Sequence, residues 1–138
     1  MKDNIFIDTN IIIYAYSKTE IEKNKIANEL IFSNKYVYIS TQVINELINI
    51  LLKKFKVDLI SIENILLELE ENFKIINFSL NTQKKAIYIK EKYKFQYYDS
   101  LIIATAIENN CSILYTEDMQ HNQIIENNLK IINPFKGY

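Results

Sequence analysis

Four acidic residues stand next to segments typical of strands and helices, and together they could support one kind of chemistry: Asp8, Glu46, Asp99 and Asp118. Carboxylates that converge repel each other, by roughly 4 kcal/mol for two charges about 4 Å apart at an effective dielectric constant of about 20. A fold that gathers several of them therefore needs a cation, and hard oxygen ligands suit Mg²⁺ or Mn²⁺. Such an ion can bind a phosphodiester and lower the pKa of an attacking water. These residue types therefore point to phosphodiester hydrolysis.

The elements that must position these acids alternate along the chain between short apolar runs and longer amphipathic stretches. The pattern predicts strands over residues 4–7, 36–39, 74–76, 112–115 and 130–132, and helices over residues 11–16, 20–32, 43–55, 61–72, 82–93 and 99–109. Strands that alternate with helices indicate right-handed crossovers and a parallel sheet covered on both faces. We therefore expect an α/β fold with a short parallel sheet.

This expected topology brings several of the acids to one edge of the sheet. Asp8 directly follows the first predicted strand, and Asp118 comes shortly after Tyr115, where the fourth predicted strand ends. In parallel α/β sheets, ligand-binding and catalytic residues lie at the carboxyl ends of the strands. Asp99 begins the predicted buried helix, and Glu46 lies at the margin of the apolar stripe of its helix. Taken singly, these acids are explained as helix caps, a solvated helix residue and a turn residue; their conjunction favours a site.

Length and composition exclude several other classes of protein. A chain of 138 residues is long enough for one core and too short for two, so we expect a single domain over residues 1–138. Gly137 is the only glycine, which excludes a glycine-rich phosphate loop. The single cysteine, Cys111, excludes an internal disulfide and fits a reducing cytoplasm. No apolar run approaches the roughly 18 residues of a membrane span, so no membrane partner is expected.

The charged and aromatic residues outside the four acids support less specific interpretations. With one histidine and one cysteine, zinc is a poor match. All 16 basic residues are lysines, which we interpret mainly as solvated helix faces, with RNA tracking as the alternative. Tyr97 and Tyr98 precede Asp99, and core or dimer packing is favoured for them over stacking on a nucleobase.

Four motifs resemble those of the PIN-domain nucleases, in the same order and over nearly the whole chain. The run IFIDTN over residues 5–10 is similar to the opening motif of that family, and VINEL over residues 43–47 resembles the second. The third resemblance is YDSLIIA over residues 98–104, and the fourth is LYTED over residues 114–118. Each motif is weak or moderate alone, whereas all four in order make a strong match.

The resemblance implies a three-layer α/β/α sandwich of Rossmann-like topology and Mg²⁺- or Mn²⁺-dependent endoribonuclease activity. It implies that the four acids are metal ligands, directly or through water, and that nearby polar residues orient carboxylates or water: Thr9, Asn10 and Thr116. The chain is most similar to VapC-like toxins of toxin–antitoxin pairs. The family therefore also implies a homodimer and, for a toxin, a small antitoxin whose tail blocks the cleft.

Departures from the family pattern leave alternatives open. Glu117, next to Asp118, could share or replace its role, and Asn122 stands where a PIN subgroup has glycine. A processing nuclease that is not a toxin, or a PIN fold without activity, fits the same motifs. A receiver-type signalling module also clusters acids around Mg²⁺, but its lysine at the end of the last strand is missing. A haloacid-dehalogenase-like phosphatase requires an acid where Asn10 stands.

Overall fold

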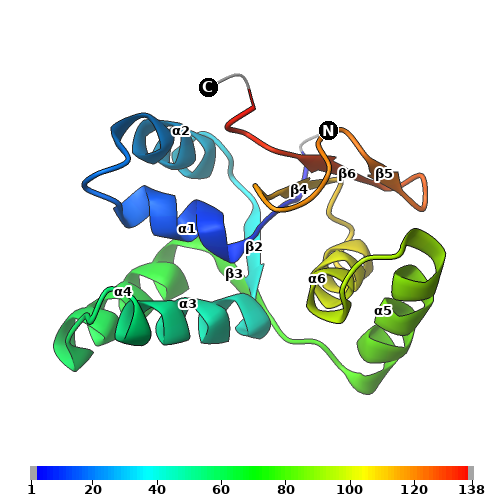
Figure 1. The fold of residues 1–138 in the computed structure, drawn as a ribbon, viewed down its shortest axis with the longest axis horizontal. Coiled ribbons are helices and arrows are strands. Elements are labelled where there is room, and N and C mark those ends of the chain that lie inside the picture. Colours follow the sequence, from blue (N-terminus) through cyan, green and yellow to red (C-terminus); the bar gives the residue numbers. More distant parts are fainter. Residues whose placement is uncertain (1–2, 137–138) are drawn as a thin grey trace.

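A six-stranded sheet runs through the centre of the computed structural model, which describes residues 3–136 (Figure 1). The strands are β1 (Ile5–Ile7), β2 (Val37–Ser40), β3 (Lys74–Ile76), β4 (Ile113–Tyr115), β5 (Ile124–Ile125) and β6 (Leu129–Ile132). Their order across the sheet is β3-β2-β1-β4-β6-β5. The chain therefore leaves β1 toward one side, through β2 and β3, and returns on the other side at β4.

The register of β1 determines where the functional residues meet. β1 is parallel to β2 and to β4, and Ile5 lies opposite both Val37 and Ile113. All three residues of β1 are buried, as expected for a central parallel strand covered on both faces. The connection after β1 leads to β2 on one side, whereas β4 and β6 lie on the other side of β1. The carboxyl ends of β1 and β4 therefore form a topological switch point, where ligands bind in open α/β sheets.

Six helices of the described chain cover the sheet in two groups (Figure 1). They are α1 (Thr9–Tyr16), α2 (Ile21–Phe32), α3 (Thr41–Lys53), α4 (Leu59–Asn72), α5 (Leu80–Tyr93) and α6 (Tyr97–Glu108). α1 to α4 lie on one side of the strands and α5 packs beside α6 on the other, consistent with a three-layer sandwich. None of the helices between residues 3 and 136 is long and apolar enough to cross a membrane.

Short polar side chains begin four of these helices. Asp8, Ser40, Asp58 and Ser79 each accept a hydrogen bond from a backbone N–H in the first turn of α1, α3, α4 and α5. These caps satisfy donors that the helix itself leaves unpaired. Ser40 is also the last residue of β2, so α3 starts without an intervening loop.

The structure confirms the α/β fold and differs from the sequence-based expectation in one edge strand and in the residues at which several helices begin. The strand β5 was not predicted, and it runs antiparallel to β6, so the sheet is only mostly parallel. β5 has two residues, too few to give a periodic signal, and the turn after it holds Glu126 and Asn127 at positive φ. α6 begins at Tyr97 instead of at Asp99, which places Asp99 within the first turn and not at the cap.

Candidate active site

Asp8 lies at the switch point between β1 and β4. Its backbone N–H donates to the carbonyl of Tyr115 at 3.0 Å, which continues the pairing of the two strands by one residue. The side chain is 5% exposed and caps α1, with Oδ1 accepting from the backbone N–H of Thr9 at 2.7 Å. Oδ2 accepts from the hydroxyl of Thr116, just past β4, at 2.8 Å. Asp8 is therefore fixed by both strands and by the helix that follows.

The surroundings of Asp8 disfavour the charged form of its carboxylate, which raises its pKa. Burial raises this pKa from 3.8 to about 6, against the hydrogen bonds from Thr116 and Thr9, which lower it. The charges of Glu46 and Asp118 raise it further. Three of the predicted acids therefore lie close enough to influence one another through their charges.

Glu46 reaches the same place from α3, one turn after the capped start of the helix. Its Oε2 accepts from the hydroxyl of Thr9 at 2.9 Å, and its Oε1 accepts from Nε2 of Gln42 at 3.1 Å. The same Nε2 donates to the carbonyl of Tyr98 on α6 at 3.1 Å. Gln42 thus connects two helices of the site. Sequence reasoning missed it, although its position four residues before Glu46 puts both on one helix face.

Asp99 projects from the first turn of α6 and is the least restrained of the four acids. It is half-buried, and its carboxylate accepts no hydrogen bond from any residue between 3 and 136. Burial raises the pKa of Asp99, and the charges of Asp118 and Glu46 raise it further. All four predicted acids are therefore linked by charge, although they come from four different elements.

Asp118 and Glu117 are neighbours with different surroundings. Asp118 is exposed, and its Oδ2 accepts from Nδ2 of Asn10 at 2.9 Å. Glu117 instead accepts from the hydroxyl of Tyr14 at 2.7 Å and pairs with Nζ of Lys23 at 2.5 Å. Although partial burial raises the pKa of Glu117, the bonds from Lys23 and Tyr14 hold it below its usual value. Glu117 is therefore engaged outside the acidic site.

The donor set suits a hard divalent cation, but the side chains are not arranged around one. Among residues 3–136 no three Asp, Glu, His or Cys side chains come together closely enough to hold a metal ion. The carboxylates of Asp8, Glu46 and Asp118 instead accept hydrogen bonds from neutral neighbours, whereas that of Asp99 accepts none from the described residues. The ligand types are all carboxylate oxygens, which match Mg²⁺ or Mn²⁺. Zinc is a poor fit because Nδ1 of His121 accepts from the backbone of Asn133, and burial raises the pKa of the Cys111 thiol to about 12.

The predicted supporting residues all contact an acid. Thr9 bonds to Glu46, Asn10 to Asp118, and Thr116 to Asp8. Of the two tyrosines before Asp99, Tyr97 is partly buried, whereas Tyr98 is 67% exposed. The sequence favoured core or dimer packing for both rings, and core packing is wrong for the ring of Tyr98.

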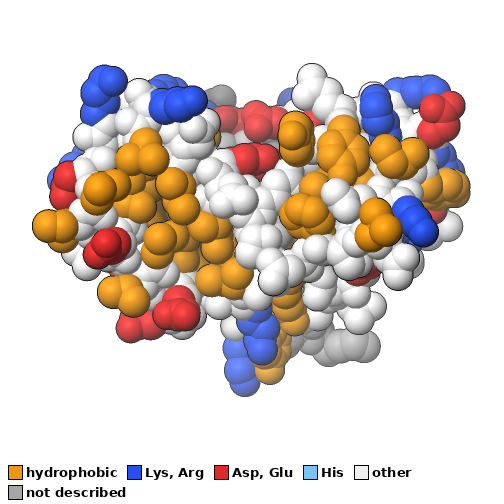
Figure 2. All heavy atoms as spheres, turned by 90° about the horizontal axis from the view of Figure 1, so that it is seen from below, with side chains coloured by type: hydrophobic (Ala, Val, Ile, Leu, Met, Phe, Trp, Pro, Cys, Tyr) orange, Lys and Arg blue, Asp and Glu red, His pale blue; other side chains and the backbone are white. Residues whose placement is uncertain are grey.

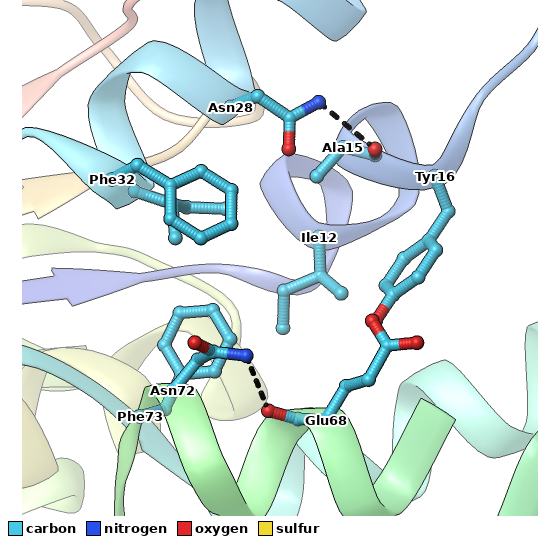
Figure 3. A pocket seen from close by; sticks show the side chains of 9 residues that line it. Ile12, Ala15, Tyr16, Asn28, Phe32, Glu68, Asn72 and Phe73 are labelled. Carbon is cyan, nitrogen blue, oxygen red and sulfur yellow. Dashed lines mark hydrogen bonds between the residues drawn. The ribbon is translucent and has the colours of Figure 1, made fainter. Parts of the chain in front are cut away.

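A pocket of about 220 Å³ lies apart from the four acids, between α1, α2 and α4 (Figure 3). Its lining is mostly apolar, including Ile12 and Phe32. Polar bonds close its rim, among them the bond from the hydroxyl of Tyr16 to Glu68 at 2.8 Å and the bond from Asn28 to the carbonyl of Ala15. None of the four predicted acids lines it, so this pocket is not the proposed reaction site.

Comparison with models of known protein families gives a match that covers most of the chain. A family model described as the PIN domain matches residues 5–126. That span includes all four acids and the strands β1 to β4. No curated protein is similar enough in sequence to count as a match.

Solved structures share the fold over most of this chain. A toxin–antitoxin complex from Klebsiella pneumoniae has a TM-score of 0.72 at 22% identity, over 96% of this chain and 98% of that chain. The sarcin–ricin loop cleaving toxin VapC20 of Mycobacterium tuberculosis has a TM-score of 0.67 at 14% identity, over 83% and 92% of the two chains. VapBC2 from Rickettsia felis, bound to a DNA fragment from its promoter, has a TM-score of 0.62 at 25% identity, over 92% and 96%.

Proposed function

The chain belongs to the PIN domain family, and from this premise we propose that it is an endoribonuclease dependent on Mg²⁺ or Mn²⁺. The observation that carries the proposal is the coupling of Asp8 to Glu46 and Asp118 at the switch point of the sheet. A buried carboxylate with a pKa of about 6, surrounded by further acids, is stabilised when a cation neutralises it. Membership in the family also removes the receiver-type and phosphatase alternatives.

We assign different residues of the chain to metal binding and to the orientation of the metal ligands. Asp8 and Asp99 are proposed as the primary metal ligands, and Glu46 and Asp118 complete the site directly or through water. Thr9 and Thr116 orient Asp8 through its two oxygens. A bound Mg²⁺ or Mn²⁺ supplies charge neutralisation for the phosphodiester and a lower pKa for the attacking water.

Further polar residues hold the remaining acids in place. Gln42 and the hydroxyl of Thr9 fix both oxygens of Glu46, and Asn10 holds Asp118. Such hydrogen bonds to metal-binding carboxylates typically change metal affinity or activity by about 10- to 100-fold when lost. The site therefore includes these neutral residues as well as the acids.

We further propose that the chain is the toxin of a toxin–antitoxin pair and acts in the cytoplasm. The similar solved structures include a toxin–antitoxin complex and VapBC2, which supports a small antitoxin as partner. A PIN-fold nuclease with a processing role is the alternative, and the two differ in their effect on cells. A toxin arrests growth on expression and is neutralised by a small protein encoded beside it.

We also propose that the chain forms a homodimer, which exposed apolar side chains support. Hydrophobic side chains gather in two groups on the face seen from below, where α3, α4 and α5 lie (Figure 2). Ile60 on α4 is 71% exposed, and Leu80, the first residue of α5, is 67% exposed. Exposed apolar residues in groups are typical of protein interfaces. Sedimentation of the purified chain at several concentrations tests this proposal.

The decisive experiment compares Asp8→Asn with Asp58→Asn. Both residues are aspartates that cap a helix, but Asp58 begins α4 and is exposed to solvent. Asp8→Asn should abolish Mg²⁺-dependent cleavage of total RNA and growth arrest on expression, whereas Asp58→Asn should cleave like the wild type. If Asp8→Asn cleaves RNA at the wild-type rate, the proposed site is wrong. If the wild type cleaves RNA without arresting growth, the processing role replaces the toxin.

A further inference from the structure

Glu117 is held by a closed set of contacts beside the acidic site. The hydroxyl of Tyr14 donates to Oε1 of Glu117 at 2.7 Å, and Nζ of Lys23 donates to Oε2 at 2.5 Å. Nζ of Lys23 also donates to the hydroxyl of Tyr14 at 3.2 Å, which closes the triangle. Each of the three polar groups therefore contacts the other two, and both oxygens of Glu117 are occupied.

The aromatic surroundings make this arrangement more rigid than an ordinary surface ion pair. Nζ of Lys23 lies 4.6 Å from the ring centroid of Tyr14 and 5.4 Å from that of Phe135. The two rings meet edge to face at 5.0 Å, and Phe135 is buried. The side chains of Lys23 and Glu117 are 28% and 26% exposed. Partial burial and cation–π contact strengthen such a pair relative to a solvated one.

Two further bonds anchor the helices that carry the triangle. Nδ2 of Asn24, the residue after Lys23, donates to the carbonyls of Tyr14 at 3.0 Å and Ala15 at 2.9 Å. The start of α2 is thereby fixed against the end of α1. Lys23 and Tyr14 consequently have little freedom relative to each other, and the position of Glu117 is set by both helices.

The backbone that carries Glu117 also carries Asp118. The N–H of Glu117 donates to Oδ1 of Asn10 at 3.4 Å, and Nδ2 of the same Asn10 donates to Asp118. The N–H of Asp118 donates to the hydroxyl of Thr116 at 3.2 Å. Asp118 itself is exposed, so its position depends on these bonds and on those that hold the adjacent Glu117.

We propose that Lys23, Tyr14 and Glu117 form a clamp that positions Asp118 and keeps the carboxylate of Glu117 away from the other acids. Lys23 is a positioning residue that acts through Glu117. Without its ammonium group, Glu117 loses the partner of one oxygen and becomes free to turn toward the acids. The proposal rests on the metal-dependent function proposed above.

The test uses Lys23→Met, which keeps the apolar stem over the rings and removes the charge. Lys25→Met is the matched control, because Lys25 is an exposed lysine on the same helix. Calorimetric titration of the metal-free full chain with Mn²⁺ should show about tenfold weaker binding for Lys23→Met, and wild-type affinity for Lys25→Met. Lys23→Arg, which keeps the charge, should recover most of the affinity. Unchanged Mn²⁺ affinity in Lys23→Met would overturn the proposal.

A second measurement separates failure of the clamp from failure of the proposed function. Amide relaxation of the metal-free protein reports the mobility of residues 116–118 without any metal or RNA. Lys23→Met and Tyr14→Phe should increase that mobility, while Lys25→Met leaves it unchanged. If the wild type binds no Mn²⁺ but the mobility increases, the proposed metal site is wrong and the clamp stands. Equal mobility in all variants would overturn the clamp.

Discussion

The hydroxyl of Thr116 donates to Oδ2 of Asp8 at 2.8 Å, and this bond joins the residues that follow two neighbouring strands. β1 and β4 are parallel and in register, so the residues just beyond their carboxyl ends meet. The hydroxyl of Thr116 also accepts from the N–H of Asp118 at 3.2 Å. One threonine therefore connects two of the acids that the proposed function requires.

Replacing Thr116 by valine should affect activity through the pKa of Asp8. The hydrogen bond from Thr116 lowers that pKa, so its loss should raise the value above about 6. The acid limb of the pH profile of kcat/KM should move to higher pH, and the rate at pH 7 should fall by about 10- to 100-fold. Thr116→Ser keeps the hydroxyl and should behave like the wild type. A profile unchanged in Thr116→Val would contradict the assigned contact.

Asp8→Asn should stabilise the metal-free fold at neutral pH. The pKa of Asp8 is about 6 in the folded protein against 3.8 ordinarily, so the folded state binds the proton more tightly. The free energy of unfolding therefore falls as pH rises from about 4 to about 6, by roughly 2–3 kcal/mol in total. Asparagine removes this cost and still caps the helix.

Urea unfolding with a chelator present measures this effect. Asp8→Asn should unfold at a higher urea concentration than the wild type at pH 7.5, and the difference should disappear near pH 4. Asp58→Asn provides the control, since hydrogen bonds from Ser61 hold the pKa of the exposed Asp58 below its usual value. If Asp8→Asn is less stable than the wild type at pH 7.5, the charge of Asp8 does not destabilise the metal-free fold and the prediction is wrong.

Mn²⁺ should raise the melting temperature of the wild type, because the proposed site exists only in the folded chain. At ten times the dissociation constant the gain is about 1.4 kcal/mol, which corresponds to about 4 °C for a domain of this size. Asp99→Asn removes a carboxylate that accepts no hydrogen bond from residues 3–136, so it should reduce the shift without a large loss of stability. Thermal scans with and without Mn²⁺ decide this, and an equal shift in both proteins would exclude Asp99 as a ligand.

Lys94→Gly should stabilise the protein independently of function. Lys94 ends α5 in the left-handed conformation, at φ 62 and ψ 34. A residue with a Cβ is strained there, so glycine should add about 0.5–1 kcal/mol to the free energy of unfolding. The ion pair lost with Glu91 is exposed and contributes little. Lys84→Gly, within the same helix, should instead destabilise by about 1 kcal/mol, and urea unfolding separates the two.

Most elements of the fold were predictable because their signals are local. The buried run of β1, the polar residues that begin helices and the apolar helix α6 are each apparent within a few consecutive residues. The order of strands and helices then predicted which edge of the sheet would carry Asp8 and Asp118. β5 was missed for the same reason, since two residues carry no periodicity.

The partners of the acids were decided by the tertiary structure. Glu117 is next to Asp118 in sequence, yet it pairs with Lys23, which is far away in the chain, because α2 and the segment after β4 meet at the same edge. In the sequence Gln42 is only a polar helix residue, and its bond to the carbonyl of Tyr98 arises because the start of α6 lies beside α3. The sequence by itself determined which residues could act and at which edge, since spacing and strand ends are local properties. Which carboxylates are held, and by what, depends on contacts between segments brought together only by the register and crossovers of the sheet.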